Sequence, residues 1–135
     1  MASPRPDPSK PYSRHRKGRG GLLVLPAEGC SLPAPKLPAG RKWSSPERAR
    51  WRELWGTPQA SMWDEAYVGV VAMLVTHEVR VLAGEASAWE AQEARHLSDR
   101  LGLTPLGLHQ LGWRLPEPGE TGDVVPLRTV PVRSS

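Results

Sequence analysis

The chain has 135 residues, with 15 prolines, 13 glycines, six tryptophans, no phenylalanine and a formal net charge of +4. This length fits one domain, or one small domain with tails, and argues against a large single-chain active-site architecture. The single cysteine, Cys30, excludes an intrachain disulfide and a zinc site built from several cysteines.

The charge is distributed unevenly along the chain. Residues 1–42 carry nine Lys/Arg and two acidic residues, whereas residues 43–135 carry nine Lys/Arg and twelve acidic residues. The basic character therefore belongs to the N-terminal part, and such an asymmetry indicates a polyanionic partner for that part. The N-terminus lacks the apolar segment of a secretory signal, and the apolar run Val68–Val75 is too short to span a membrane. We expect a soluble cytoplasmic protein without membrane contact.

Proline placement divides the chain into three parts. Eight of the fifteen prolines fall in residues 1–42, and four more fall in residues 116–135. Dense proline opposes both helix interiors and central strands. We therefore predict a basic, Pro/Gly-rich flexible arm over residues 1–42, a helical oligomerisation core over residues 43–115 and a flexible tail over residues 116–135.

Four helices are predicted in the core, at about residues 46–55, from 61–64 to about 82, 87–101 and 106–111. Serine or threonine N-caps, prolines at the first helical position and glycine stops mark their ends. In the third helix, Trp89 and the leucines that follow at helical spacing are expected to be buried. The fold class is thus an all-α, small helical bundle.

The long second helix is apolar around nearly its whole circumference, which is typical of a buried helix. One small chain offers too little surface to cover it, so we predict a homo-oligomer. The expected interface residues are Trp63, Tyr67, Val70, Val71, Leu74 and Val81.

The N-terminal arm carries the strongest binding signal. Residues 14–19 place four fixed positive charges within six positions, and such a segment binds nucleic-acid phosphates by releasing counterions. These contacts give affinity rather than sequence readout. A solubilising tail is the alternative reading of the arm. The predicted DNA-binding residues, including those near the start of the first helix, are Arg14, Arg16, Lys17, Arg19, Arg41, Lys42, Arg48 and Arg52.

Catalytic and metal-binding patterns are incomplete. His77-Glu78 begins like the zinc-protease pattern H-E-x-x-H, but Val81 stands where the second histidine is needed. The other histidines are scattered over the arm and two separate helices. We expect no catalytic residue, no metal and no cofactor, and therefore a protein that is not an enzyme.

Two segments resemble the phage terminase small subunits. The proline-rich lead at residues 32–38, followed by Trp43 and the E-R-A-R-W stretch at 47–51, is similar to the opening of that family. D-R-L-G-L-T-P at residues 99–105 is similar to its C-terminal L-G-L-T-P element. The ordered set covers about residues 14–115. Leu106-Gly107-Leu108 stands where the family usually has basic residues, which shifts the expected DNA contact to the arm.

The resemblance implies a non-enzymatic DNA-packaging subunit of a bacteriophage or prophage. It would assemble as a homo-oligomeric ring, bind double-stranded DNA and deliver it to the large terminase subunit, which residues 116–135 would contact. Two alternatives remain open. One is a small all-α DNA-binding regulator or nucleoid-type protein, and the other is a helical protein–protein adaptor without a nucleic-acid role.

Overall fold

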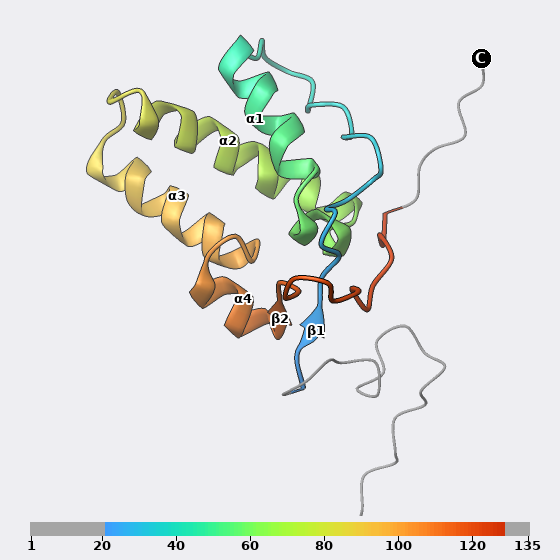
Figure 1. The fold of residues 1–135 in the computed structure, drawn as a ribbon. Coiled ribbons are helices and arrows are strands. Elements are labelled where there is room, and N and C mark those ends of the chain that lie inside the picture. The colour runs from blue at the N-terminus through green and yellow to red at the C-terminus, as the bar shows by residue number, and fades with distance from the viewer. Residues whose placement is uncertain (1–20, 129–135) are drawn as a thin grey trace, which may run out of the picture.

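The computed structural model describes residues 21–128, which form a mostly helical bundle (Figure 1). This part of the chain contains four α-helices, two short 3-10 helices and a two-stranded parallel sheet, and the all-α prediction is confirmed. In chain order the elements are β1 (Leu23–Val24), α1 (Ser45–Trp55), η3 (Pro58–Met62), η4 (Glu65–Tyr67), α2 (Val68–Leu82), α3 (Ala88–Arg100), α4 (Pro105–Leu111) and β2 (Trp113–Arg114).

Side-chain caps fix the starts of α1, α3 and α4. At α1 the cap is Ser44 rather than Ser45, because Ser44 and Glu47 form a reciprocal capping box. Ser87 accepts a hydrogen bond from the Glu90 N–H at 3.1 Å, and Thr104 accepts one from the Gly107 N–H at 2.9 Å. Each cap satisfies a backbone donor that the helix itself leaves unpaired. These three starts lie within one residue of the predicted ones.

The predicted long second helix is wrong at its start, which was placed at residues 61–64 and thus four to seven residues too early. Residues 58–67 form two 3-10 helices, and α2 begins only at Val68. Between η3 and η4 the backbone at Trp63 is extended, with φ −98° and ψ 126°. This conformation lets the Trp63 indole N–H donate to the Leu101 carbonyl at 3.2 Å. Burial of one large aromatic ring therefore overrides the helical periodicity of the sequence.

The core lies where α1 and α3 pack on either side of α2 (Figure 1). Trp51 and Trp55 of α1 and Trp63 form a chain of edge-on ring contacts, with centroid distances of 5.6 and 5.2 Å. Helix α2 adds Val71, Leu74 and Val75, and the end of α3 adds Leu97 and Leu101. These side chains are nearly inaccessible to solvent, so a single chain forms its own hydrophobic core.

The N-terminal segment from residue 22 packs on the helices, which corrects the prediction of a flexible arm reaching residue 42. Strand β1 pairs in parallel with β2, and Leu25 and Cys30 are buried in the core. The Trp51 indole N–H donates to the Pro35 carbonyl at 2.7 Å. Tryptophan N–H groups thus fix the proline-rich lead along α1, whereas residues 1–20 lie outside the described part.

The C-terminal segment also packs, at least as far as residue 128, which corrects the predicted tail. Asp123 donates its backbone N–H to the Val24 carbonyl at 2.8 Å, and its carboxylate accepts the Val24 N–H at 3.0 Å. Gly122 lies so close to Pro26 that an added Cβ would come within 2.7 Å of its Cα. Proline in this segment removes hydrogen-bond donors, yet it does not prevent packing.

Candidate nucleic-acid interface

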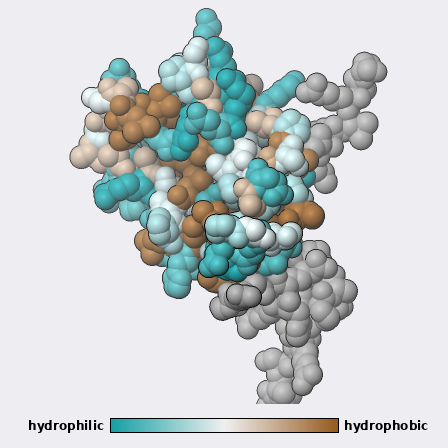
Figure 2. Space-filling view, viewed as in Figure 1, coloured by the Kyte–Doolittle hydropathy of each residue, from teal (hydrophilic) through white to brown (hydrophobic). Residues whose placement is uncertain are grey.

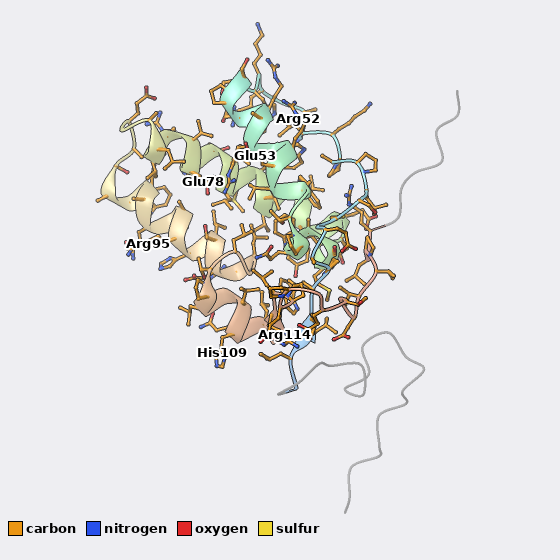
Figure 3. The ribbon with its side chains drawn as sticks, viewed as in Figure 1. Arg52, Glu53, Glu78, Arg95, His109 and Arg114 are labelled. Carbon is orange, nitrogen blue, oxygen red and sulfur yellow. The ribbon has the colours of Figure 1, made fainter. Side chains whose placement is uncertain are left out.

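Helix α1 turns two arginines toward solvent. Trp51, Leu54 and Trp55 face the core, whereas Arg48 and Arg52 are exposed beside this buried stripe. The two arginines are four positions apart, which places them on one face of the helix. Figure 3 shows Arg52 on this helix, next to Glu53. This pair gives the exposed side of α1 a positive charge.

Two lysines, Lys36 in the lead and Lys42 between the lead and α1, add positive charge near this surface. Lys36 lies next to Pro35, whose carbonyl is bound by Trp51 of α1, and Lys42 lies two residues before the helix cap. Both lysines are exposed. Within residues 21–128 neither lysine forms an ion pair, nor does Arg48 or Arg52. We call this set the basic face: Lys36, Lys42, Arg48 and Arg52.

Most other arginines of the described segment hold the fold together. Arg50 on α1 pairs with Glu78 of α2 and with Glu53, and Arg114 pairs with Glu120 at 2.5 Å. Arg80 of α2 pairs with Glu90 of α3 at 2.9 Å. Of the arginines between residues 21 and 128, α3 carries the two other exposed ones without an ion pair, Arg95 and Arg100. Unpaired positive charge is therefore concentrated on α1 and its lead.

Arg41 was predicted to contact DNA, but its guanidinium already has several partners. It donates to Glu47 at 2.7 Å and to the Thr76 hydroxyl of α2 at 2.9 Å, and it lies 3.5 Å above the Trp43 ring. These contacts join the start of α1 to α2. Glu47 also neutralises the arginine, so Arg41 contributes little to the net charge of this surface.

The ion pair between Arg41 and Glu47 makes the stability of the fold depend on pH. The Arg41 guanidinium lowers the pKa of Glu47 to about 2 from an ordinary 4.5, with the Ser44 cap assisting. A lowered folded-state pKa stabilises the fold above pH 4.5, and this contribution disappears as the pH falls toward 2. We expect about 1–2 kcal/mol, because Arg41 is partly exposed and solvent screens the pair.

A Glu47→Gln variant measures this contribution. Thermal unfolding of both proteins should differ most near neutral pH, and the two melting temperatures should converge as the pH is lowered toward 2. A constant difference across the acid range would show that Glu47 stabilises α1 by capping alone and that the ion pair contributes nothing.

The predicted DNA-binding residues Arg14, Arg16, Lys17 and Arg19 lie outside the described residues, so their role remains a prediction. Lys42, Arg48 and Arg52 are exposed on α1 or shortly before it, and their role in DNA binding stays a prediction as well. Lys36 was missed, because only the hydrogen bond from Trp51 to Pro35 brings the lead alongside α1.

The predicted oligomer interface is corrected at three positions. Trp63, Val71 and Leu74 have no exposed surface, because α1 and α3 of the same chain cover them. They are therefore unavailable to a second subunit. Tyr67, Val70 and Val81 are half-buried and pack against the same core. At these three positions the prediction was wrong because it assumed that one chain leaves the second helix largely uncovered.

Other apolar side chains are exposed instead. Met73 of α2 is 50% exposed and Trp89 of α3 is 62% exposed, although Trp89 was expected in the core. Trp89 follows the helix cap Ser87 by two residues and packs edge-on against His77. Met73 and His77 also line a mostly apolar groove of about 290 Å³ with Trp43. We call Met73 and Trp89 the apolar pair.

A further hydrophobic patch covers the C-terminal half of α2 in Figure 2, where Leu82 is 79% exposed. It borders a groove of about 570 Å³ between α2 and α3, whose lining includes Glu78 and Arg95 (Figure 3). Glu78 already pairs with Arg50 of α1.

Searches of residues 21–128 find no group of three or more His, Cys, Asp or Glu side chains that could bind a metal ion. In the same stretch, no helix combines the length and apolarity needed to cross a bilayer. Comparison of the chain with protein-family models, with curated proteins and with solved structures finds no match.

Proposed function

We propose that the chain is a DNA-packaging subunit of the terminase small-subunit type, which binds double-stranded DNA as a homo-oligomeric ring and delivers it to the large terminase subunit. The observation that carries the proposal is the basic face. Its four unpaired cations lie on α1 and the lead, and the chain continues N-terminally into four more cations at residues 14–19. Both sets offer positive charge for binding phosphate groups.

The proposed contacts are electrostatic. Arginine and lysine bound to phosphates release condensed counterions, which gives affinity that falls steeply with salt. Such contacts position a duplex without reading its bases. Each contact is weak, but a ring presents many copies of the basic face at high effective concentration, so the assembly binds far more tightly than one chain.

The arrangement of α3 and α4 favours this proposal over a site-specific regulator. The two helices are joined by a short turn with left-handed Gly102, as in a helix-turn-helix. A recognition helix needs side chains that hydrogen-bond to bases. The exposed side chains of α4 include Leu106, His109 and Gln110, with no lysine or arginine. This helix therefore offers little for base readout.

A pair of charge-matched variants tests the basic face. We expect Arg48→Gln/Arg52→Gln to weaken duplex binding about tenfold or more and to reduce the salt slope by about 2, because two phosphate contacts are lost. The control Arg95→Gln/Arg100→Gln removes the same charge from α3 and should bind like the wild type. Fluorescence anisotropy over a salt series measures both. Equal losses in the two variants would mean that only net charge matters and would contradict the basic face.

Deletion of residues 1–21 tests the arm. DNA retention in a gel-shift assay should be lost, whereas the oligomer should persist, because the arm carries charge and the helices carry assembly. An unchanged gel shift would refute the arm as a DNA-binding element.

Light scattering on a sizing column tests the ring. A discrete assembly of many chains at both low and high salt is the expected result. A monomer or dimer under all conditions would contradict the ring and favour the regulator or the adaptor.

A further inference from the structure

The segment that follows β2 is bound tightly at its base. Arg114 of β2 donates two hydrogen bonds to the Glu120 carboxylate, at 2.7 and 2.5 Å. Asp123 then exchanges two hydrogen bonds with Val24 of β1. Side-chain and backbone contacts therefore fix this segment as far as residue 123.

Beyond Asp123 the attachment is thinner. Leu127 donates its N–H to the Ser61 carbonyl at 2.9 Å, and Arg128 donates to the Pro33 carbonyl at 2.6 Å. Val125 is 77% exposed, and within residues 124–128 the one buried side chain is that of Arg128. Val124 packs against the core but is only partly buried, so a large part of the attachment of this stretch comes from a charged group.

The buried guanidinium of Arg128 has no carboxylate partner among the described residues. It lies 4.8 Å above the Trp55 ring, and its Nε has no hydrogen-bond partner there. Burial of an unpaired charge is unfavourable, as is an unsatisfied buried N–H. The contact with Trp55, the hydrogen bond to the Pro33 carbonyl and a long hydrogen bond of 4.0 Å to the Cys30 sulfur offset part of this cost, but none of them supplies a countercharge.

Within the described part of the chain, two further buried polar atoms lack a hydrogen-bond partner, and both belong to residues that this stretch touches. They are the indole nitrogen of Trp55 and the hydroxyl of Ser61. When residues 124–128 detach, water can hydrogen-bond to the Arg128 guanidinium. Water can then also approach the polar atoms of Trp55 and Ser61. The unmet hydrogen bonds thus lower the free-energy difference between the attached and the detached state.

We propose that residues 124–128 form a releasable strap, which opens while the helical bundle stays folded. Opening exposes Trp55, Cys30 and the Pro33 carbonyl, which Arg128 contacts in the closed state. Cys30 lies under the strap, with its Sγ 4.0 Å from Arg128 Nη2. The opening does not depend on the proposed function.

Cys30 provides the test, because it is the single cysteine of the chain and is 8% exposed. The rate of its labelling by a thiol reagent is measured on the full chain at urea concentrations below the unfolding transition. We expect labelling at least tenfold faster than global unfolding allows, with almost no dependence on urea, because strap opening exposes little surface. Labelling that follows the urea dependence of global unfolding would overturn the proposal.

Substitution of the strap sharpens the test. Arg128→Met keeps an apolar side chain of similar length without the charge, and it should close the strap and slow labelling about tenfold. Val125→Ala, at an exposed position of the same strap, should leave the rate unchanged. Unchanged or faster labelling of Arg128→Met would show that the buried charge does not favour opening, which would overturn the energetic basis of the proposal.

Truncation after residue 123 gives an independent check. Labelling should approach the rate of an exposed thiol, with the helical circular dichroism retained. A truncated chain whose Cys30 stays protected would also refute the strap. None of these assays contains DNA, so their failure would leave the proposed function untouched.

Discussion

A Trp63→Ala variant is expected to lose about 3–5 kcal/mol of its free energy of unfolding, which approaches the whole stability of a small domain. The Trp63 ring has no exposed surface and packs edge-on against Trp55, with ring centroids 5.2 Å apart. It also stacks on Tyr67, and its N–H donates to the Leu101 carbonyl. Alanine removes these contacts, leaves a cavity and strands a buried carbonyl.

Urea denaturation at two protein concentrations measures this loss and its origin. The loss should be independent of protein concentration, because Trp63 belongs to the core of one chain. The control is Leu106→Ala, which removes an apolar side chain that is 54% exposed and lies outside the apolar pair, and it should cost less than about 1 kcal/mol. A Trp63→Ala variant that keeps its stability but loses its assembly would restore Trp63 to the subunit interface and contradict the core assignment.

The helix ends of this fold could be read from the sequence because their causes are local. Ser87 satisfies a backbone N–H three residues away, and Thr104 with Pro105 does the same for α4. Gly102 adopts φ +74°, and an added Cβ there would also meet the Trp113 ring at 2.6 Å. A side chain at that position would therefore be excluded by both conformation and packing.

The packing of both chain ends could not be read in this way. Val24 and Asp123 exchange hydrogen bonds across 99 positions of sequence, and Leu23 pairs with Trp113 across 90. Proline density indicates missing hydrogen-bond donors, but it does not say whether a tryptophan N–H elsewhere will bind the proline carbonyls. The lead is such a case, since its attachment depends on Trp43 and Trp51.

The sequence predicts only part of the candidate site. Spacing alone places Arg48 and Arg52 on one face of a helix. It cannot separate them from Arg41 and Arg50, whose partners Thr76 and Glu78 lie on another helix. The structure thus divides one cluster of arginines into a set that holds α1 on α2 and a set that faces solvent.

The apolar pair carries the second large expected effect. A Met73→Gln/Trp89→Gln variant should reduce the solution mass from that of a many-chain assembly to that of a single chain. Methionine and tryptophan are enriched in subunit interfaces, and both side chains are at least half exposed on the isolated chain. Because neither belongs to the core, the free energy of unfolding of the chain should change by less than about 1 kcal/mol per substitution.

The control is Leu106→Gln/Leu111→Gln, which removes two exposed apolar side chains from α4 and should leave the assembly intact. Loss of assembly in this control, or survival of the assembly in the apolar-pair variant, would place the interface elsewhere.

Duplex binding by the apolar-pair variant adds a second readout. A single chain keeps its basic face but loses the effective concentration of a ring, so the apolar-pair variant should bind DNA weakly while its salt slope per chain stays unchanged. Weak binding with a lower slope would instead mean that Met73 or Trp89 supports the DNA surface itself.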